Sequence, residues 1–315
     1  MQEAETQRNS EDKNDRSLLA SGTLRLSVES LSRSIERRRS ISMSSDVDKQ
    51  VRLVLEQDMA GPELVAVGGG VAAVWSGKCP GASSSNEDGA LVGPIEEQSA
   101  VLAVADGMGG AQAGQKAASV ALRALLRTVT GAAPNGSTLR TPILDGVEKA
   151  NEAVVGLGLG AATTLAVVEV QNDTIRPYHV GDSTILLAGQ RGKIKLQTVR
   201  HSPVGFAVES GQLDESEAMK RTDRHIVSNV VGDRQMRIEV GPTLRLAARD
   251  TLLLATDGLC DNLYVHEIVA IVRSGPIEKA AGRLIETARA RMTQPGDGQP
   301  SKPDDLTFIL FRRRP

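Results

Sequence analysis

The chain is poor in aromatic residues and in cysteine. Phe, Trp and Tyr make up only 2 % of its 315 residues, so the hydrophobic core must consist mainly of Ala, Val, Leu and Ile. Its two cysteines, Cys79 and Cys260, lie far apart in the sequence and show no CxxC or Cys/His spacing. This pattern argues against a disulfide framework and a structural zinc site, and it favours reduced thiols in the cytoplasm.

Long apolar runs and a large net charge are also missing. No run of about 18 apolar residues occurs, as a membrane span would need, and the N-terminal MQEAETQRNSEDKNDR lacks the apolar segment of a signal peptide. The formal net charge is only −2, from 37 basic and 39 acidic residues, which creates no overall field toward nucleic acid or an anionic membrane. We therefore expect a cytoplasmic protein without a nucleic-acid or membrane partner.

Two regions differ in composition. Residues 1–60 contain no aromatic residue and are rich in Ser, Arg, Asp and Glu, which predicts a polar, flexible N-terminal tail. Within it the run Arg37–Ser40 places a hydroxyl beside three positive charges; this is a modification site, an electrostatic docking patch or simply part of a solvated tail. Residues 61–315 have the pattern of a globular domain.

Short β-rich runs and helix-period segments fill this second region. Strands are expected at 71–76, 98–105, 161–170, 183–189, 193–197, 236–241, 251–256 and 305–311, and helices near 113–128, 141–155, 209–220, 263–273 and 276–292. Several strand runs are continuously apolar, as in strands buried on both faces. Strands and helices come in clusters, which favours an α+β fold with helices over mostly antiparallel sheets.

Aspartates stand where the hydrophobic strands end. The run Val101–Ala105 leads into Asp106-Gly107, and Thr251–Thr256 leads into Asp257-Gly258. Asp304 and Asp305 precede the last strand, and Asp182 joins two strands in the middle of the chain. Because neighbouring strands lie only about 4.8 Å apart, these carboxylates can converge on one small volume.

Converging carboxylates repel one another unless a cation offsets their charge. An all-oxygen ligand set suits Mg²⁺ or Mn²⁺, and Gly107, which has no side chain, lets its own carbonyl approach as a further ligand. The alternative is that each Asp-Gly pair forms only a tight turn. Four carboxylate positions at strand ends favour the metal site over four separate turns.

The ordered motifs resemble those of the metal-dependent type 2C protein serine/threonine phosphatases, as a bacterial-type member. The resemblance covers roughly residues 70 to 312. In chain order the motifs are Asn86-Glu87-Asp88-Gly89, Asp106-Gly107-Met108-Gly109-Gly110, Gly160–Leu165, His179–Ser183, His201–Val204, Val230–Gly232, Leu253–Asp261 and Asp304–Thr307.

The resemblance implies a fold and a set of metal ligands. The implied fold for residues 61–315 is a four-layer α-β-β-α sandwich, in which helices flank two mostly antiparallel sheets. Asp106 would bridge two Mn²⁺ or Mg²⁺ ions, the Gly107 carbonyl would bind one, and Asp257 and Asp304 would complete the other. The remaining implied ligands are Glu87 and Asp88, which hold metal-bound waters, and Asp182 and Asp261, which bind a weaker third ion.

The resemblance further implies a hydrolase that removes phosphate from phosphoserine and phosphothreonine in proteins, in signal transduction. The attacking group would be a metal-bound hydroxide, with Asp88, Asp106, Asp257 and Asp304 as the catalytic carboxylates. The expected partners are a phosphorylated protein substrate and a cognate Ser/Thr kinase.

Three positions depart from the family pattern: Ser83 where an arginine commonly grips the phosphate, Met108 where some relatives have histidine, and Thr184 in place of an arginine. The missing arginine keeps open a second hypothesis, a regulatory module that binds a phosphorylated protein with little or no turnover. A third hypothesis, hydrolysis of a small phosphorylated metabolite, uses the same metal chemistry.

Overall fold

The structure is a computed structural model, and it describes residues 51–132, 138–158 and 160–314. These residues belong to one compact unit, Gln50–Pro315, which is separate from Met1–Lys49. The flexible tail expected for residues 1–60 and the Arg37–Ser40 motif therefore lie mostly outside the described residues. The end of that range belongs to the folded unit. Arg52–Leu55 pair with a strand of the unit, and Met59 packs against its hydrophobic core.

Two antiparallel sheets form the centre of the unit. The first has the order β1 (Arg52–Leu55), β4 (Gly89–Glu96), β5 (Ser99–Ala105), β8 (Leu165–Gln171), β9 (Thr174–Val180), β12 (Glu239–Val240), with β13 (Leu244–Arg245) also on β9. The second has the order β11 (Ile194–Gln197), β10 (Thr184–Ala188), β14 (Thr251–Ala255), β15 (Leu306–Arg313), β3 (Gly70–Gly77), β2 (Glu63–Val67). A small third sheet pairs β6 (Gly107–Met108) with β7 (Ala162–Thr163).

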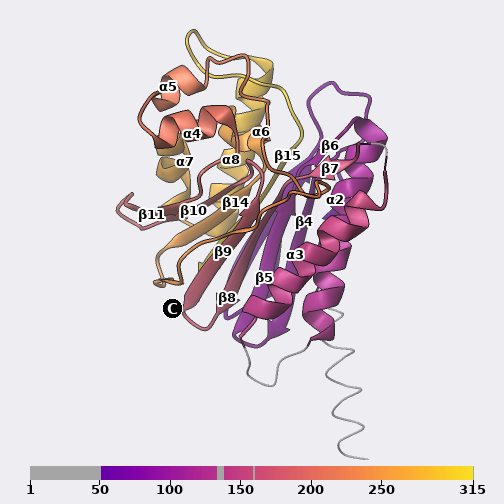
Figure 1. Cartoon of the computed structure of the whole chain (residues 1–315). Coiled ribbons are helices and arrows are strands. Elements are labelled where there is room, and N and C mark those ends of the chain that lie inside the picture. The colour runs from indigo at the N-terminus through magenta and orange to yellow at the C-terminus, as the bar shows by residue number, and fades with distance from the viewer. Residues whose placement is uncertain (1–50, 133–137, 159, 315) are drawn as a thin grey trace, which may run out of the picture. The chain divides into compact units, whose positions relative to one another are not determined.

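Helices cover the two outer faces, as Figure 1 shows. The first sheet carries α2 (Ala111–Gly131) and α3 (Arg140–Val155), and the second carries α7 (Val265–Val272) and α8 (Ile277–Thr293). Three shorter helices are α4 (Pro203–Glu209), α5 (Glu215–Ala218) and α6 (Asp257–Cys260). The arrangement confirms the four-layer α-β-β-α sandwich.

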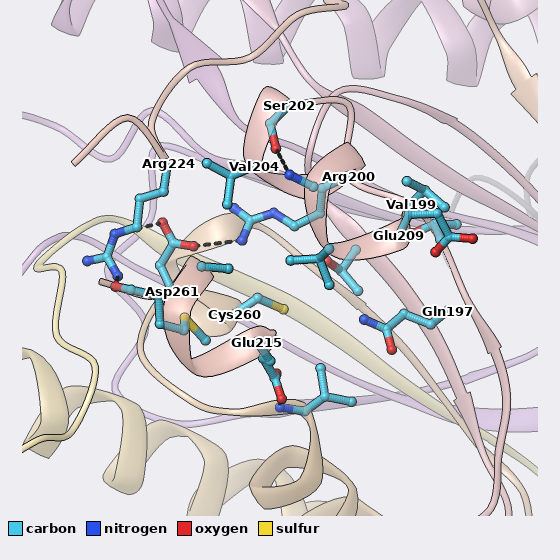
Figure 2. A pocket seen from close by; sticks show the side chains of 17 residues that line it. Gln197, Val199, Arg200, Ser202, Val204, Glu209, Glu215, Arg224, Cys260 and Asp261 are labelled. Carbon is cyan, nitrogen blue, oxygen red and sulfur yellow. Dashed lines mark hydrogen bonds and ion pairs between the residues drawn. The ribbon is translucent and has the colours of Figure 1, made fainter. Parts of the chain in front are cut away.

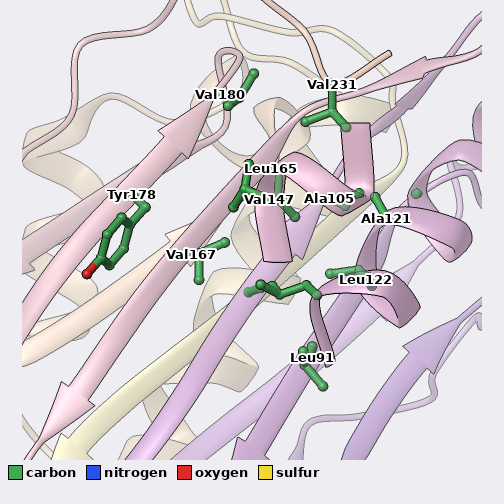
Figure 3. Close-up of a cluster of buried hydrophobic side chains, with 14 of the residues drawn as sticks. Leu91, Ala105, Ala121, Leu122, Val147, Leu165, Val167, Tyr178, Val180 and Val231 are labelled. Carbon is green, nitrogen blue, oxygen red and sulfur yellow. The ribbon is translucent and has the colours of Figure 1, made fainter. Parts of the chain in front are cut away.

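Three buried apolar layers hold the sandwich together, one between the sheets and one under each helix pair. Figure 3 shows part of the layer under α2 and α3, where Leu122 and Val147 of the helices face Leu91 and Val167 of the strands. These layers are made mostly of Ala, Val, Leu and Ile, as the scarcity of aromatic residues requires. The central strands are apolar on both faces because each sheet is covered on both sides.

The expected elements differ from the structure at several places. The helix predicted at 209–220 is wrong for most of its length: only the short α5 lies within it, and a turn at Ser210-Gly211 follows the end of α4. Strands β1, β2, β4, β6, β9 and β13 were not expected. Two of them, β4 and β9, each contain a proline, which weakens a strand pattern. Pro94 lies at a break in the β4 register, and Pro177 lies between the short partners β12 and β13, where a ladder donor is not needed.

Among the described residues, no helix combines the length and the apolar character that crossing a membrane requires.

Candidate metal centre

Strand pairing places most of the predicted carboxylates at the same end of the sandwich. Asp88 and Asp106 are neighbours because Gly89 pairs with Ala105 across β4 and β5. Asp257 follows β14, Asp304 precedes β15, and these two strands are paired. Asp182 lies just before β10, whose Thr184 pairs with Ala255 at the end of β14. Residues far apart in the sequence thus meet because their strands begin or end at one edge.

The electrostatics of Asp106 show that these groups converge. Burial raises the pKa of Asp106 well above its ordinary value, and the negative charges of Asp257, Asp88, Asp182 and Asp304 raise it further. Its carboxylate has no hydrogen bond or ion pair with any residue that the structure describes. Asp106 is only partly buried, and its carboxylate is surrounded by like charges and lacks a partner among these residues. A divalent cation would stabilise a carboxylate in such an environment.

Three neighbouring aspartates also have raised pKa values. Burial, opposed by the positive charge of Arg200, raises the pKa of Asp182 to about 6. Burial and then the charge of Asp257 raise the pKa of Asp304 to about 6. The pKa of Asp88 is also raised, first by burial, although a hydrogen bond from Thr256 opposes the shift. The cluster therefore holds more negative charge than its protein neighbours neutralise.

Glycines leave room for Glu87 and for the Gly107 carbonyl. A Cβ at Gly114, on α2, would lie 2.0 Å from Glu87 Oε2 and 2.7 Å from the Gly107 carbonyl carbon. A Cβ at Gly107 would lie 2.2 Å from the Gly114 oxygen. Only glycine fits at both places, so a carboxylate and a backbone turn share a space that side chains would fill.

Asp305 fixes the loop that carries Glu87. Its Oδ1 accepts a 2.7 Å hydrogen bond from the Cys79 backbone N–H, and its Oδ2 accepts one of 2.7 Å from the Glu87 N–H. The next residue toward the N-terminus, Asp304, accepts from the Asp305 N–H at 2.9 Å. Both Asp305 oxygens thus accept backbone hydrogen bonds that hold the loop. Asp304, and not Asp305, contributes its carboxylate to the cluster.

Three basic residues enter the same region from other segments. Arg200 lies 2.8 Å from Asp261 Oδ1 and 3.4 Å from Asp182 Oδ2. Figure 2 shows Arg200 and Arg224 reaching the buried Asp261 from two sides. Both arginines line a cavity of ≈ 240 Å³, together with residues of α4 and α5. Lys302 Nζ lies 2.6 Å from Asp257, 3.0 Å from Asp304 and 3.1 Å from Asp261.

The chain is similar to known proteins in both sequence and fold. The family model described as protein phosphatase 2C matches residues 81–290. The chain belongs to the protein phosphatase 2C family.

Bacterial protein phosphatases are similar to much of the chain. Serine/threonine protein phosphatase PstP of Mycobacterium tuberculosis is 28 % identical over 237 residues, which cover 72 % of this chain and 42 % of PstP. Protein phosphatase PhpP of Streptococcus pneumoniae is 32 % identical over 184 residues, covering 55 % of this chain and 73 % of PhpP. The chain thus spans less than half the length of PstP.

A solved structure has the same fold. The catalytic domain of PstP in complex with two manganese ions superimposes with a TM-score of 0.63 at 25 % identity, covering 78 % of this chain and 98 % of that domain. The membership in the 2C family and the α-β-β-α fold that the sequence predicted are therefore confirmed.

The structure brings together the residues predicted from the sequence, but it adds two that sequence reasoning missed. Arg200 stands directly before the His201–Val204 motif, and Lys302 stands two residues before Asp304. Their closeness to motif residues was the only signal. Ser83, at the position of the missing arginine, is exposed. Burial raises the pKa of the Cys260 thiol to about 11, so this thiol is a packed group and not a reactive nucleophile.

His179, His201 and Glu239 form a second group of potential metal ligands. However, His201 Nδ1 accepts a hydrogen bond from the Gly181 N–H at 3.1 Å, and its Nε2 lies 3.0 Å from Glu239 Oε2. A metal at Nε2 would require an imidazole with no proton on either nitrogen. We interpret the group as a hydrogen-bonded support for Gly181, the residue before Asp182.

Proposed function

We propose that this chain is a metal-dependent phosphatase that hydrolyses phosphoserine and phosphothreonine in proteins. The observation that carries the proposal is the convergence of Asp106, Asp257 and Asp304, in which the unpaired Asp106 carboxylate is surrounded by like charges. All donors in the cluster are oxygens, the ligand chemistry of Mn²⁺ and Mg²⁺. Membership in the 2C family and the two manganese ions in the similar PstP structure support it.

Each residue has a proposed role in holding the ions. Asp106 would help to hold two ions, the Gly107 carbonyl would hold one of them, and Asp257 and Asp304 would hold the other. Of the further residues, Glu87 and Asp88 would hold coordinated waters, and Asp182 and Asp261 would hold a third, weaker ion. When bound, such ions lower the pKa of coordinated water and neutralise charge on the phosphoryl oxygens.

The protein's own residues then position water and phosphate. The Asp88 carboxylate, held by Thr256 at 2.8 Å, is oriented to accept a hydrogen bond from a water molecule. Arg200 offsets part of the negative charge of Asp182 and Asp261, which weakens their repulsion of an incoming phosphate. Met108 has no titratable group, so protonation of the leaving serine or threonine oxygen must come from water or from Asp182.

The substrates are proposed to be cytoplasmic phosphoproteins, made by a Ser/Thr kinase, since only such an enzyme supplies phosphoserine and phosphothreonine. Cys79 and Cys260 are both free thiols, which supports a reducing compartment. In this proposal the chain acts in signal transduction and removes the phosphate groups that the kinase adds.

Hydrolysis of a phosphothreonine peptide in the presence of Mn²⁺ tests the proposal. Asp106→Ala is expected to lower kcat/KM by about a thousandfold, because cation stabilisation of the transition state amounts to several kcal/mol. Asp145→Ala is the matched control, since Asp145 is an exposed carboxylate on α3 and its loss should leave the rate unchanged.

Two outcomes would contradict the proposal. Peptide binding without turnover at any Mn²⁺ or Mg²⁺ concentration would favour the regulatory module. Turnover of small phosphate esters with none of the peptide would favour a metabolite phosphatase.

A further inference from the structure

The ammonium group of Lys302 occupies a cation position within the carboxylate cluster. Its three carboxylate contacts, at 2.6, 3.0 and 3.1 Å, are to Asp257, Asp304 and Asp261. Asp257 and Asp304 are the two side chains assigned above to one metal ion, and Asp261 is assigned to the third. No contact joins Lys302 to Asp106 or to Gly107 among the described residues.

The backbone holds Lys302 in this position. The Lys302 N–H donates to Asn262 Oδ1 at 2.8 Å, and Asn262 Nδ2 donates to the Lys302 carbonyl at 2.8 Å and to the Gly258 carbonyl at 2.9 Å. Asn262 is fully buried, and its own carbonyl accepts from Arg291 at 3.0 Å. The Asn262 side-chain amide thus binds both the N–H and the carbonyl of Lys302 and fixes the Lys302 backbone beside α6. This backbone position directs the lysine side chain into the cluster.

The side chain is nevertheless able to leave. The Lys302 side chain is 23 % exposed, and its four-carbon stem is flexible, unlike the rigid fork of arginine. A divalent ion at the Asp257 and Asp304 position would stand within a few ångströms of the ammonium group and would repel it strongly in a partly buried site. The ion and the ammonium group therefore cannot share this position.

We propose that Lys302 is an internal counter-cation that occupies the Asp257 and Asp304 position in the metal-free protein and must be displaced when a metal ion binds there. This inference rests on the proposed metal centre. None of the residues that the structure describes offers such a competitor to the ion at Asp106 and Gly107. The two metal positions are therefore unequal: one ion binds directly, and the other binds more weakly because it exchanges with an ammonium group.

Titration calorimetry of the full chain with Mn²⁺, together with thermal unfolding in a chelator, tests the exchange. The wild type should show a tighter and a weaker class of site. Lys302→Met should tighten the weaker class by about tenfold or more, because a competing positive charge is removed. The same variant should melt at a lower temperature without metal, because three carboxylates lose their counter-ion.

Two further variants control the measurement. Lys279→Met removes the same charge from an exposed position on α8 and should change neither quantity. Lys302→Arg keeps the charge and should keep the weaker class weak. If Lys302→Met is too unstable in chelator, Lys302→Gln carries the same expectation for Mn²⁺ affinity.

The two proposals fail in different ways. Equal Mn²⁺ affinity of the weaker class in the wild type and in both neutral Lys302 variants would overturn the exchange but leave the metal centre intact. Absence of Mn²⁺ binding in all the proteins would overturn the metal centre and the exchange together. Loss of the weaker class in Lys302→Met would also overturn the exchange, because it would make Lys302 a support of that position and not its competitor.

Discussion

Thr256 Oγ1 donates a 2.8 Å hydrogen bond to Asp88 Oδ2. This contact joins the two sheets at the candidate metal centre, because Thr256 directly follows β14 and Asp88 directly precedes β4. Thr256 also binds the last strand, since its Oγ1 accepts from the Thr307 N–H at 3.0 Å. One hydroxyl thus aligns a candidate water-holding carboxylate with the strands that carry Asp257 and Asp304.

Replacing this hydroxyl should therefore affect stability and activity together. Thr256→Val keeps the shape but leaves the buried Asp88 oxygen and the Thr307 N–H without their partner, at a cost of about 1 to 3 kcal/mol in unfolding free energy. Phosphopeptide turnover with Mn²⁺ should fall as well. Thr222→Val, at an exposed position, is the control for urea denaturation. Wild-type stability of Thr256→Val would show that the hydrogen bond contributes nothing.

Arg200 should be the most sensitive basic residue near the site. It pairs with the fully buried Asp261 and with Asp182, and removing one member of a buried pair costs about 3 kcal/mol or more. Arg200→Met should thus unfold at clearly lower denaturant concentration. Arg245→Met is the matched control, because Arg245 pairs with Asp173 at 2.9 Å but is 82 % exposed, and such surface pairs contribute only about 0 to 1 kcal/mol. Similar losses in the two variants would contradict the assignment.

The glycine at 114 provides a test of the space around Glu87. Gly114→Ala would place a Cβ 2.0 Å from Glu87 Oε2, so the carboxylate must move and Mn²⁺ affinity measured by calorimetry should fall. Gly282→Ala, also within a helix, meets nothing within 4 Å and should stabilise the protein by about 0.5 to 1 kcal/mol. Unchanged Mn²⁺ binding in Gly114→Ala would mean that Glu87 and Gly107 are not at the centre.

Strand ends could be predicted from the sequence because they follow a simple physical rule. The apolar runs before Asp106 and Asp257 are long and end abruptly at a charge, so both the buried strands and the emergence of the carboxylates could be read from one pattern. Asp182 and Asp304 follow the same rule with weaker signals. Their convergence required the strand order, which only the family resemblance indicated.

Lys302 and Arg200 could not be predicted in this way. A single basic residue in a loop has no period, and its role depends on carboxylates that lie as many as 61 residues away, as between Arg200 and Asp261. The same limit explains why β9 was not predicted. Its Pro177 argues against a strand, and proline is tolerated there because the partner strands β12 and β13 pair with β9 only on either side of it. The local sequence pattern thus predicted most of the strands and helices. The positions of Arg200 and Lys302 beside the carboxylates depend on tertiary contacts and could not be predicted from it.

The buried pair of histidines should make stability depend on pH. His179 stacks on His201 with a 4.3 Å centroid separation, and burial, followed by the charge of His201, lowers the pKa of His179 below its ordinary value, against opposing effects of Val199 and Glu239. The folded state thus keeps His179 neutral where the unfolded chain, with a pKa of about 6.5, takes up a proton. Stability should therefore decrease as the pH falls below about 6.5, by at most about 1.4 kcal/mol per pH unit for this one group.

Urea denaturation of the wild type and of His179→Gln at pH 7.5 and 5.5 measures this effect. Glutamine retains an amide donor for the Val199 carbonyl, which His179 Nε2 contacts at 3.0 Å, but it takes up no proton in this range. Other groups titrate in both proteins, so the informative quantity is the difference between their two losses. The wild type should lose more stability than His179→Gln on acidification; an equal loss would mean that His179 is protonated as easily in the folded protein as in the unfolded chain.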